Sequence, residues 1–217
     1  MKRKILEIIQ YFLNLFNFEL VNKIPSAPIY EVDRIIDIGV AHGTIPLLRN
    51  YPNGYFVLIE PNPRFHKYIE SNILNKFEGK LIKSGAGDKK TFLNLDDDGL
   101  TSSFFERDET KSSVDKFIVE VNTLDNILDE IKFFSNNEPT LLKIDTEGFE
   151  LNVLKGSTKI LLSDTLKYII LELRISFIKN NYNPSDIFVY LEKFGFKFLR
   201  IDKVAHRKKG ISYLDIT

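Results

Sequence analysis

The feature that most constrains the fold is residues 141–156, LLKIDTEGFELNVLKG, where a short apolar stretch runs into an acidic turn. The apolar start predicts a strand, and the apolar positions that follow from Phe149 recur at helical spacing. In open α/β sheets, ligands bind at the carboxyl ends of the strands. Asp145 and Glu147 lie at such an end and are therefore candidates for chemistry. The alternative is that Asp145 caps the helix while Glu147 and Glu150 complement its dipole.

Strands and helices alternate through most of the chain. Residues 34–39, 55–60, 80–84 and 168–173 predict further buried strands, and residues 63–75 predict a helix that links two of them. This alternation is typical of a parallel sheet with right-handed crossovers. We therefore predict an α/β fold with a Rossmann-like, doubly wound sheet whose strands are mostly parallel.

A long polar loop interrupts this pattern. Residues 91–95 and 117–121 look extended, and they flank a Ser- and Asp-rich loop at residues 96–113. The loop is long for a connection in a compact domain, so we interpret it as mobile or as a lid. Beyond residue 173, a helix and two short strands are predicted, at residues 187–194, 196–201 and 211–214.

The N-terminal stretch differs from the rest. We divide the chain into an amphipathic helix with a linker at residues 1–30 and the Rossmann-like domain at residues 31–217. Glu7 and Gln10 interrupt the apolar run, which argues against a signal peptide and against a membrane span. Most such helices cover a flank of their own domain, so membrane contact is the disfavoured alternative.

Composition excludes several classes of protein. Thirty basic residues offset thirty acidic ones, and a neutral balance argues against a nucleic-acid partner bound through its phosphates. The chain has no cysteine, which rules out disulfides, thiolate zinc sites and a cysteine nucleophile. The lack of cysteine favours a cytoplasmic location.

A glycine turn after the first predicted strand indicates a cofactor site. Asp37, Gly39 and Gly43 form D-x-G-x-x-x-G, and glycines there let the backbone approach a ligand. Ala41 replaces the middle glycine of the dinucleotide fingerprint, and Asp37 would lie badly near a phosphate. Glu60 ends the next strand, where an acidic side chain can accept hydrogen bonds from ribose hydroxyls. The pattern favours S-adenosylmethionine over a dinucleotide.

With these motifs the chain resembles the FkbM family of class I S-adenosylmethionine-dependent methyltransferases. The resemblance extends over residues 34–172 and is carried by four motifs, at residues 36–43, 60–61, 121–125 and 142–156. It implies a seven-stranded sheet with one antiparallel strand, and methyl transfer usually to a hydroxyl oxygen, with S-adenosylhomocysteine as the product. His42 departs from the family pattern, which commonly has a small amide there.

The resemblance also implies roles for the cofactor-binding residues. Gly39 and Gly43, with Ala41 in the same turn, would pass under the methionine portion, and Asp37 would help hold its amino group. Glu60 would bind the ribose. Ala86 and Asp88 follow the third strand and would border the adenine, with helix capping as the alternative role of Asp88.

The catalytic base is expected at the strand ends. We favour Asp145, which is also predicted to bind the cofactor, with Glu147 second and His42 third. Glu172 and Arg174, at the end of the fifth strand, are candidates for acceptor binding. A divalent metal between Asp145 and Glu172 is disfavoured because no clear third ligand is present.

The predicted function is O-methylation of a hydroxyl on a saccharide, glycoconjugate or similar metabolite, so the expected partner is a small-molecule or glycan acceptor. The alternatives are an N-methyltransferase, a dinucleotide-dependent oxidoreductase and a non-catalytic module that binds S-adenosylmethionine. The oligomeric state is not predicted.

Overall fold

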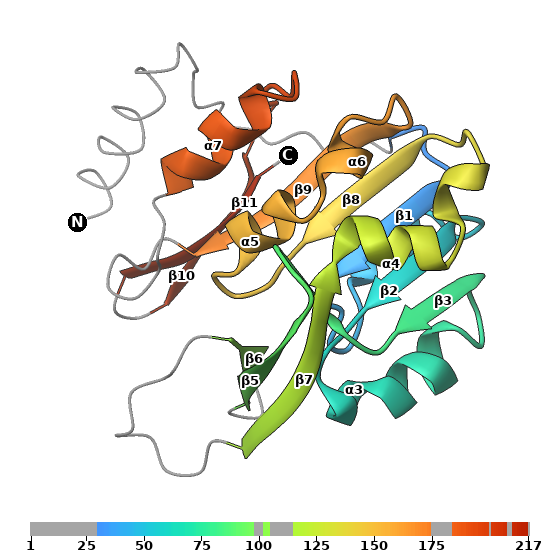
Figure 1. Cartoon of the computed structure of the whole chain (residues 1–217), viewed down its shortest axis with the longest axis vertical. Coiled ribbons are helices and arrows are strands. Elements are labelled where there is room, and N and C mark those ends of the chain that lie inside the picture. The colour runs from blue at the N-terminus through green and yellow to red at the C-terminus, as the bar shows by residue number, and fades with distance from the viewer. Residues whose placement is uncertain are drawn as a thin grey trace.

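The computed structural model describes residues 30–97, 102–104, 115–174, 184–199, 201–207 and 210–216 (Figure 1). The predicted helix within residues 1–30 lies outside these ranges. None of the helices within the described ranges is long and apolar enough to cross a membrane.

Seven strands form the main sheet, in the order β10-β11-β9-β8-β1-β2-β3. Strand β11 runs antiparallel to both of its neighbours, and the remaining pairs are parallel. The bounds are β1 (Arg34–Ile38), β2 (Tyr55–Ile59), β3 (Gly79–Ile82), β8 (Thr140–Ile144), β9 (Leu166–Arg174), β10 (Ile201–Arg207) and β11 (Gly210–Ile216). The predicted Rossmann-like α/β fold with a mostly parallel sheet is therefore confirmed.

The main sheet has the seven strands and the one antiparallel strand that the resemblance implied, but the prediction did not include a second sheet. The second sheet has the order β4-β7-β5-β6. Its strands are β4 (Gly85–Gly87), β5 (Thr91–Asp97), β6 (Ser102–Ser103) and β7 (Asp115–Thr123). Strands β5 and β7 pair with each other in antiparallel register, and β6 pairs with the end of β5. Part of the predicted loop at residues 96–113 thus belongs to this second sheet.

Helices cover both faces of the main sheet, because strands β1, β2 and β8 carry apolar side chains on both sides. Ile36, Val57 and Leu142 face one core, and Ile35 and Phe56 face the other. The first core is closed by α4 (Leu124–Glu130), the short helix η2 (Phe133–Ser135), α5 (Glu150–Lys155), α6 (Thr158–Leu161) and α7 (Pro184–Glu192). The second core is closed by α2 (Ile45–Asn50), α3 (Pro63–Tyr68) and its π-helical continuation η1 (Ile69–Ile73).

The strand register brings three strand ends together. Strand β1 lies between β2 and β8, and its last residue, Ile38, pairs with both Ile59 and Ile144. Parallel strands place their carboxyl ends at one edge of the sheet. The turns that follow β1, β2 and β8 therefore meet at a single edge.

Helix α5 and strand β4 approach each other so closely that glycine is required between them. A Cβ atom on Gly156 would lie 1.9 Å from the carbonyl oxygen of Gly87. By contrast, Gly195 has a φ of +83°, and a Cβ atom on it would have no other atom within 4 Å.

We expect Gly156→Ala to lower the free energy of unfolding by about 3 kcal/mol, since a backbone carbonyl must move to admit the methyl group. The matched variant Gly195→Ala adds only backbone strain and should cost about 1 kcal/mol. Urea denaturation of both variants measures the difference. Equal losses would mean that the contact between α5 and β4 relaxes at little cost.

Candidate active site

A pocket lies at the carboxyl ends of β1, β2 and β8. It is lined by Ile38, Gly39, Ala41, Glu60, Pro61, Phe65, Gly85, Ala86, Leu95, Ser102, Phe104, Asp145, Thr146 and Glu147. The second sheet contributes one wall of it, through β4, β5 and β6. Three of the lining side chains, Glu60, Asp145 and Glu147, are carboxylates, and none of the described lining residues is basic.

The turn after β1 is built around a close backbone contact. Gly39 has a φ of +81°, and a Cβ on it would lie 1.8 Å from the carbonyl oxygen of Asp145. The backbone N–H of Gly39 donates to the Ile59 carbonyl at 3.0 Å, and that of Asp145 donates to the Ile38 carbonyl at 3.0 Å. Only glycine satisfies both the φ angle and the contact. The predicted glycine requirement thus arises from the β8 turn as well as from any ligand.

Glu60 organises the same turn from the neighbouring strand. Its carboxylate accepts hydrogen bonds from the backbone N–H groups of Ala41 and Asn62, each at 2.8 Å. Ala41 has a φ of 47°, which costs a non-glycine residue about 1–2 kcal/mol. Burial raises the pKa of Glu60, while the N–H groups of Ala41 and Asn62 oppose that rise. The hydrogen bond from Ala41 thus helps to hold the turn in its left-handed conformation.

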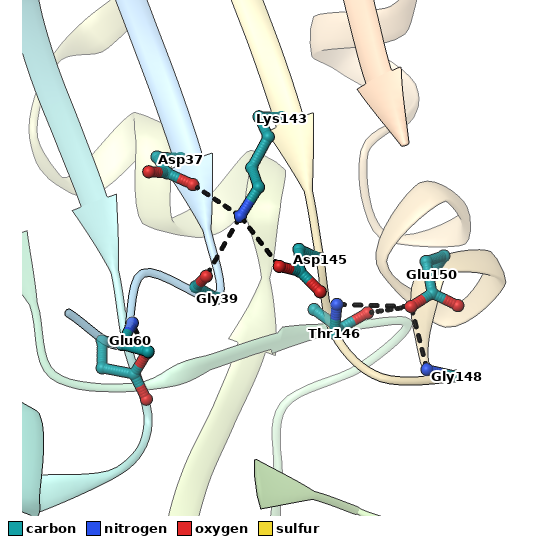
Figure 2. A network of polar contacts seen from close by, with 9 residues as sticks. Asp37, Gly39, Glu60, Lys143, Asp145, Thr146, Gly148 and Glu150 are labelled. Atoms are coloured by element: carbon teal, nitrogen blue, oxygen red, sulfur yellow. Dashed lines mark hydrogen bonds and ion pairs between the residues drawn. The ribbon is translucent and has the colours of Figure 1, made fainter. Parts of the chain in front are cut away.

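A buried lysine that was not predicted as a site residue lies behind the pocket lining, between Asp37 and Asp145. The Lys143 Nζ atom is 3.2 Å from Asp37 Oδ1, 3.2 Å from Asp145 Oδ2 and 3.1 Å from the Gly39 carbonyl oxygen (Figure 2). Burial alone would lower the pKa of Lys143, but the two carboxylates outweigh it and raise that pKa above its usual value. The signal that could have revealed this residue is a lysine inside an otherwise apolar strand, two positions before an aspartate.

Asp37 is not among the residues that line the pocket. Its side chain is 3 % exposed and faces Lys143. Burial raises the pKa of the Asp37 carboxyl, whereas the charge of Lys143 and a hydrogen bond with the Thr44 side chain act in the opposite direction. In this arrangement the Asp37 carboxylate faces the Lys143 ammonium, and its contact with a cofactor amino group stays a prediction.

The turn after β8 is held by Glu150. This fully buried side chain accepts hydrogen bonds through Oε1 from the Thr146 backbone N–H at 3.2 Å, the Thr146 hydroxyl at 3.2 Å and the Gly148 N–H at 2.9 Å (Figure 2). Between these donors, Glu147 adopts a φ of 55° and Gly148 a φ of 110°. Glu150 is thus a structural residue of the turn. Strained backbone of this kind clusters at functional sites, and Glu147 lies at the pocket.

His42 lies apart from the pocket. Its exposed ring makes edge contacts with Phe65 and Tyr68 on α3, with ring centroids 4.9 Å and 5.1 Å away. It is not among the residues that line the pocket. The structure therefore does not bring His42 together with Asp145 and Glu147.

Of the remaining predicted residues, one lines the pocket and the others with described side chains do not. Ala86 lines the pocket as expected, while Asp88 is exposed and Glu172 lies on β9, both outside the lining. Arg174 ends β9, and its side chain falls outside the described part of the chain. Among the residues with described positions, no group of three or more His, Cys, Asp or Glu could hold a metal ion.

A second polar network was also missed from the sequence. Asn62 is fully buried, and its side-chain amide donates to Asp97 Oδ2 at 3.0 Å and to the Ser102 hydroxyl at 2.9 Å. Arg64 Nη1 lies 3.1 Å from Asp97 Oδ2. Because the backbone N–H of Asn62 also donates to Glu60, this residue joins the second sheet to the β2 end of the pocket.

Comparison with known proteins gives a family. A model of the methyltransferase FkbM domain matches residues 37–198. A comparison with curated protein sequences finds no match.

Among solved structures, the chain is similar to Aeropyrum pernix fibrillarin in complex with natively bound S-adenosyl-L-methionine, at 10% identity over 89% of this chain and 70% of that one, with a TM-score of 0.48. It is also similar to N,N-8-amino-8-demethyl-D-riboflavin dimethyltransferase (RosA) from Streptomyces davawensis, at 13% identity over 99% of this chain and 56% of that one, with a TM-score of 0.42. A third is a TehB-like methyltransferase from Corynebacterium glutamicum, at 8% identity, 99% and 96% coverage and a TM-score of 0.41.

We expect Glu150→Gln to lower the free energy of unfolding by about 1–3 kcal/mol, because an amide places a donor where the carboxylate has only acceptors and weakens the hydrogen bonds that hold the turn. Glu147→Gln makes the same chemical change on a partly exposed side chain and is the matched control. Chemical denaturation should show a clearly smaller loss for Glu147→Gln. If Glu147→Gln costs as much, the turn is not held by Glu150.

Proposed function

The chain belongs to the FkbM family of methyltransferases, and from this premise we propose that it transfers a methyl group from S-adenosylmethionine to a hydroxyl oxygen of a saccharide, glycoconjugate or similar metabolite. The observation that carries the proposal is the acidic pocket at the ends of β1, β2 and β8, with Asp145 at its edge.

The chemistry of the lining suits S-adenosylmethionine. Glu60, Asp145 and Glu147 carry negative charge, and the described lining offers no basic side chain to compensate it. Such a site suits a ligand with a sulfonium and an ammonium group, and it disfavours a pyrophosphate, which argues against the dinucleotide-dependent alternative. Small residues at Gly85 and Ala86 leave an apolar wall that suits a base ring.

Particular residues are suited to hold the cofactor. Glu60 would bind the ribose: each of its oxygens accepts one backbone hydrogen bond, and a carboxylate oxygen has two lone pairs, so acceptor capacity remains for hydroxyls. The turn containing Gly39, Ala41 and Gly43 would pass beneath the methionine portion. Its left-handed residues turn the backbone at the ends of β1 and β2.

The chain's own contribution to the reaction would be alignment and proton removal. When bound, S-adenosylmethionine supplies an electrophilic methyl group. Asp145 is the favoured base because its side chain is 26 % exposed and lines the pocket at the central strand end. A positioned base contributes about 10²–10⁴-fold to the rate. Glu147 is the second candidate, while His42 is disfavoured because it does not itself line the pocket and its exposed ring packs against Phe65 and Tyr68.

The acceptor is tested by incubating the protein with methyl-labelled S-adenosylmethionine and a panel of glycans, hydroxylated metabolites and amines. We expect label on a hydroxyl oxygen of a saccharide-containing acceptor, identified by NMR of the product. Label on nitrogen would overturn O-methylation in favour of an N-methyltransferase. Binding of S-adenosylhomocysteine without transfer to any acceptor would favour a non-catalytic module.

We expect Asp145→Asn to lower kcat by about 10²–10⁴-fold while S-adenosylhomocysteine affinity changes little. The reason is that the amide cannot remove the proton from the hydroxyl group that is methylated. Glu60→Gln is the matched carboxylate-to-amide change at the ribose end, and it should mainly weaken S-adenosylhomocysteine binding. Calorimetry and steady-state kinetics on both variants separate the two roles. Equal losses of affinity and kcat for Asp145→Asn would assign it to cofactor binding instead.

A further inference from the structure

The ammonium group of Lys143 lies among three oxygen atoms: it donates hydrogen bonds to Asp145 and to the Gly39 carbonyl and forms an ion pair with Asp37. Asp37 comes from β1, the Gly39 carbonyl from the turn after β1, and Asp145 from the end of β8, all within 3.2 Å of Nζ (Figure 2). An ammonium has three donors and no acceptor, so this environment satisfies it. The group is 7 % exposed, which is rare for a lysine unless it is paired.

The strand register creates this arrangement. Asp37 pairs directly with Lys143 across β1 and β8, so the two side chains leave the sheet on the same face. Asp145 follows two positions after Lys143, which puts its side chain on that face as well. Two of the charged groups therefore lie on strands, and the third, Asp145, directly follows β8 and is still paired with β1 through its backbone N–H.

The cluster runs from the interior to the pocket. The side chain of Asp37 is 3 % exposed, that of Lys143 7 % and that of Asp145 26 %. The interior carboxylate holds the ammonium, and the ammonium holds the carboxylate at the rim together with the Gly39 carbonyl. Only the rim end, Asp145 with the Gly39 turn, lines the pocket.

We propose that Lys143 is a positioning residue for methyl transfer, which fixes the Asp145 carboxylate and the Gly39 carbonyl relative to each other, with Asp37 as its buried counter-ion. The inference rests on the proposed function, because Asp145 is taken as the base. Lys143 does not line the pocket, so it acts through Asp145 and touches neither cofactor nor acceptor.

Stability alone does not account for the cluster. Replacing a buried ion pair by apolar side chains of similar volume is often neutral or stabilising, and the rest of β8 is apolar apart from Thr140. What an apolar side chain at position 143 could not do is hold the rim carboxylate. A misplacement of about 1 Å at a reacting group can cost about 10²-fold in rate.

The test separates this role from a structural one by removing both interior charges. Lys143→Met alone leaves Asp37 buried without its cation, so we expect a lower Tm. In Asp37→Asn/Lys143→Met that penalty is removed, and the Tm should return to near the wild-type value. Asp145 still lacks its cation, so kcat should stay at least about tenfold below wild type while S-adenosylhomocysteine affinity is retained. Lys155→Met, an exposed lysine on α5, is the matched control and should change neither quantity.

Recovery of both Tm and kcat in the double variant would overturn the proposal, since Lys143 would then serve only to neutralise Asp37. If asparagine is poorly accommodated at position 37, Asp37→Leu/Lys143→Met replaces the pair by apolar side chains and is judged by the same two outcomes. In an Asp145→Asn background, the double replacement should cause little further loss of kcat, and a full additional loss would also overturn the proposal. Full turnover of Asp145→Asn itself would instead reject Asp145 as the base, which is a failure of the proposed function.

Discussion

Parallel pairing of β1 with β8 is the constraint on which the site depends. The register sets Asp37 opposite Lys143 and ends both strands at the same edge of the sheet. It also brings the Gly39 backbone against the Asp145 carbonyl, where no side chain fits. Because backbone hydrogen bonds fix this register, the strand ends at the pocket are held as rigidly as the sheet itself. The polar groups there are preorganised before any ligand arrives.

The second sheet contributes one wall of the pocket. The main sheet alone offers only strand ends and turns, whereas β4, β5 and β6 add a wall with small and apolar residues. Asn62 joins the two parts, since its backbone contacts Glu60 and its side chain contacts Asp97 and Ser102. A change in the second sheet would therefore reach the Glu60 end of the pocket through one fully buried amide.

Most of the main sheet and part of the site could be predicted from sequence. Apolar runs identify strands locally, and carboxylates placed just after them, such as Glu60 and Asp145, fall at the pocket by the geometry of parallel sheets. The features that could not be predicted depend on pairing between residues far apart in the sequence. Periodicity does not say which strands pair, so the second sheet was missed. It also does not say which charged side chains meet across a sheet, so the pairing of Asp37 with Lys143 was overlooked. Asn62 caps α3 in the structure, and no local pattern shows that its side chain also reaches the second sheet.

The order of strands at the far edge of the main sheet has a consequence for biosynthesis. Strand β11 follows β10 in the chain but lies between β10 and β9, and it is the only partner through which β10 reaches the described sheet. During synthesis β10 therefore leaves the ribosome before it has a place to pair. The two strands form a local hairpin, so they can fold first with each other and then add to β9 as one unit. That edge of the domain can therefore be added after the strands that build the pocket have been made.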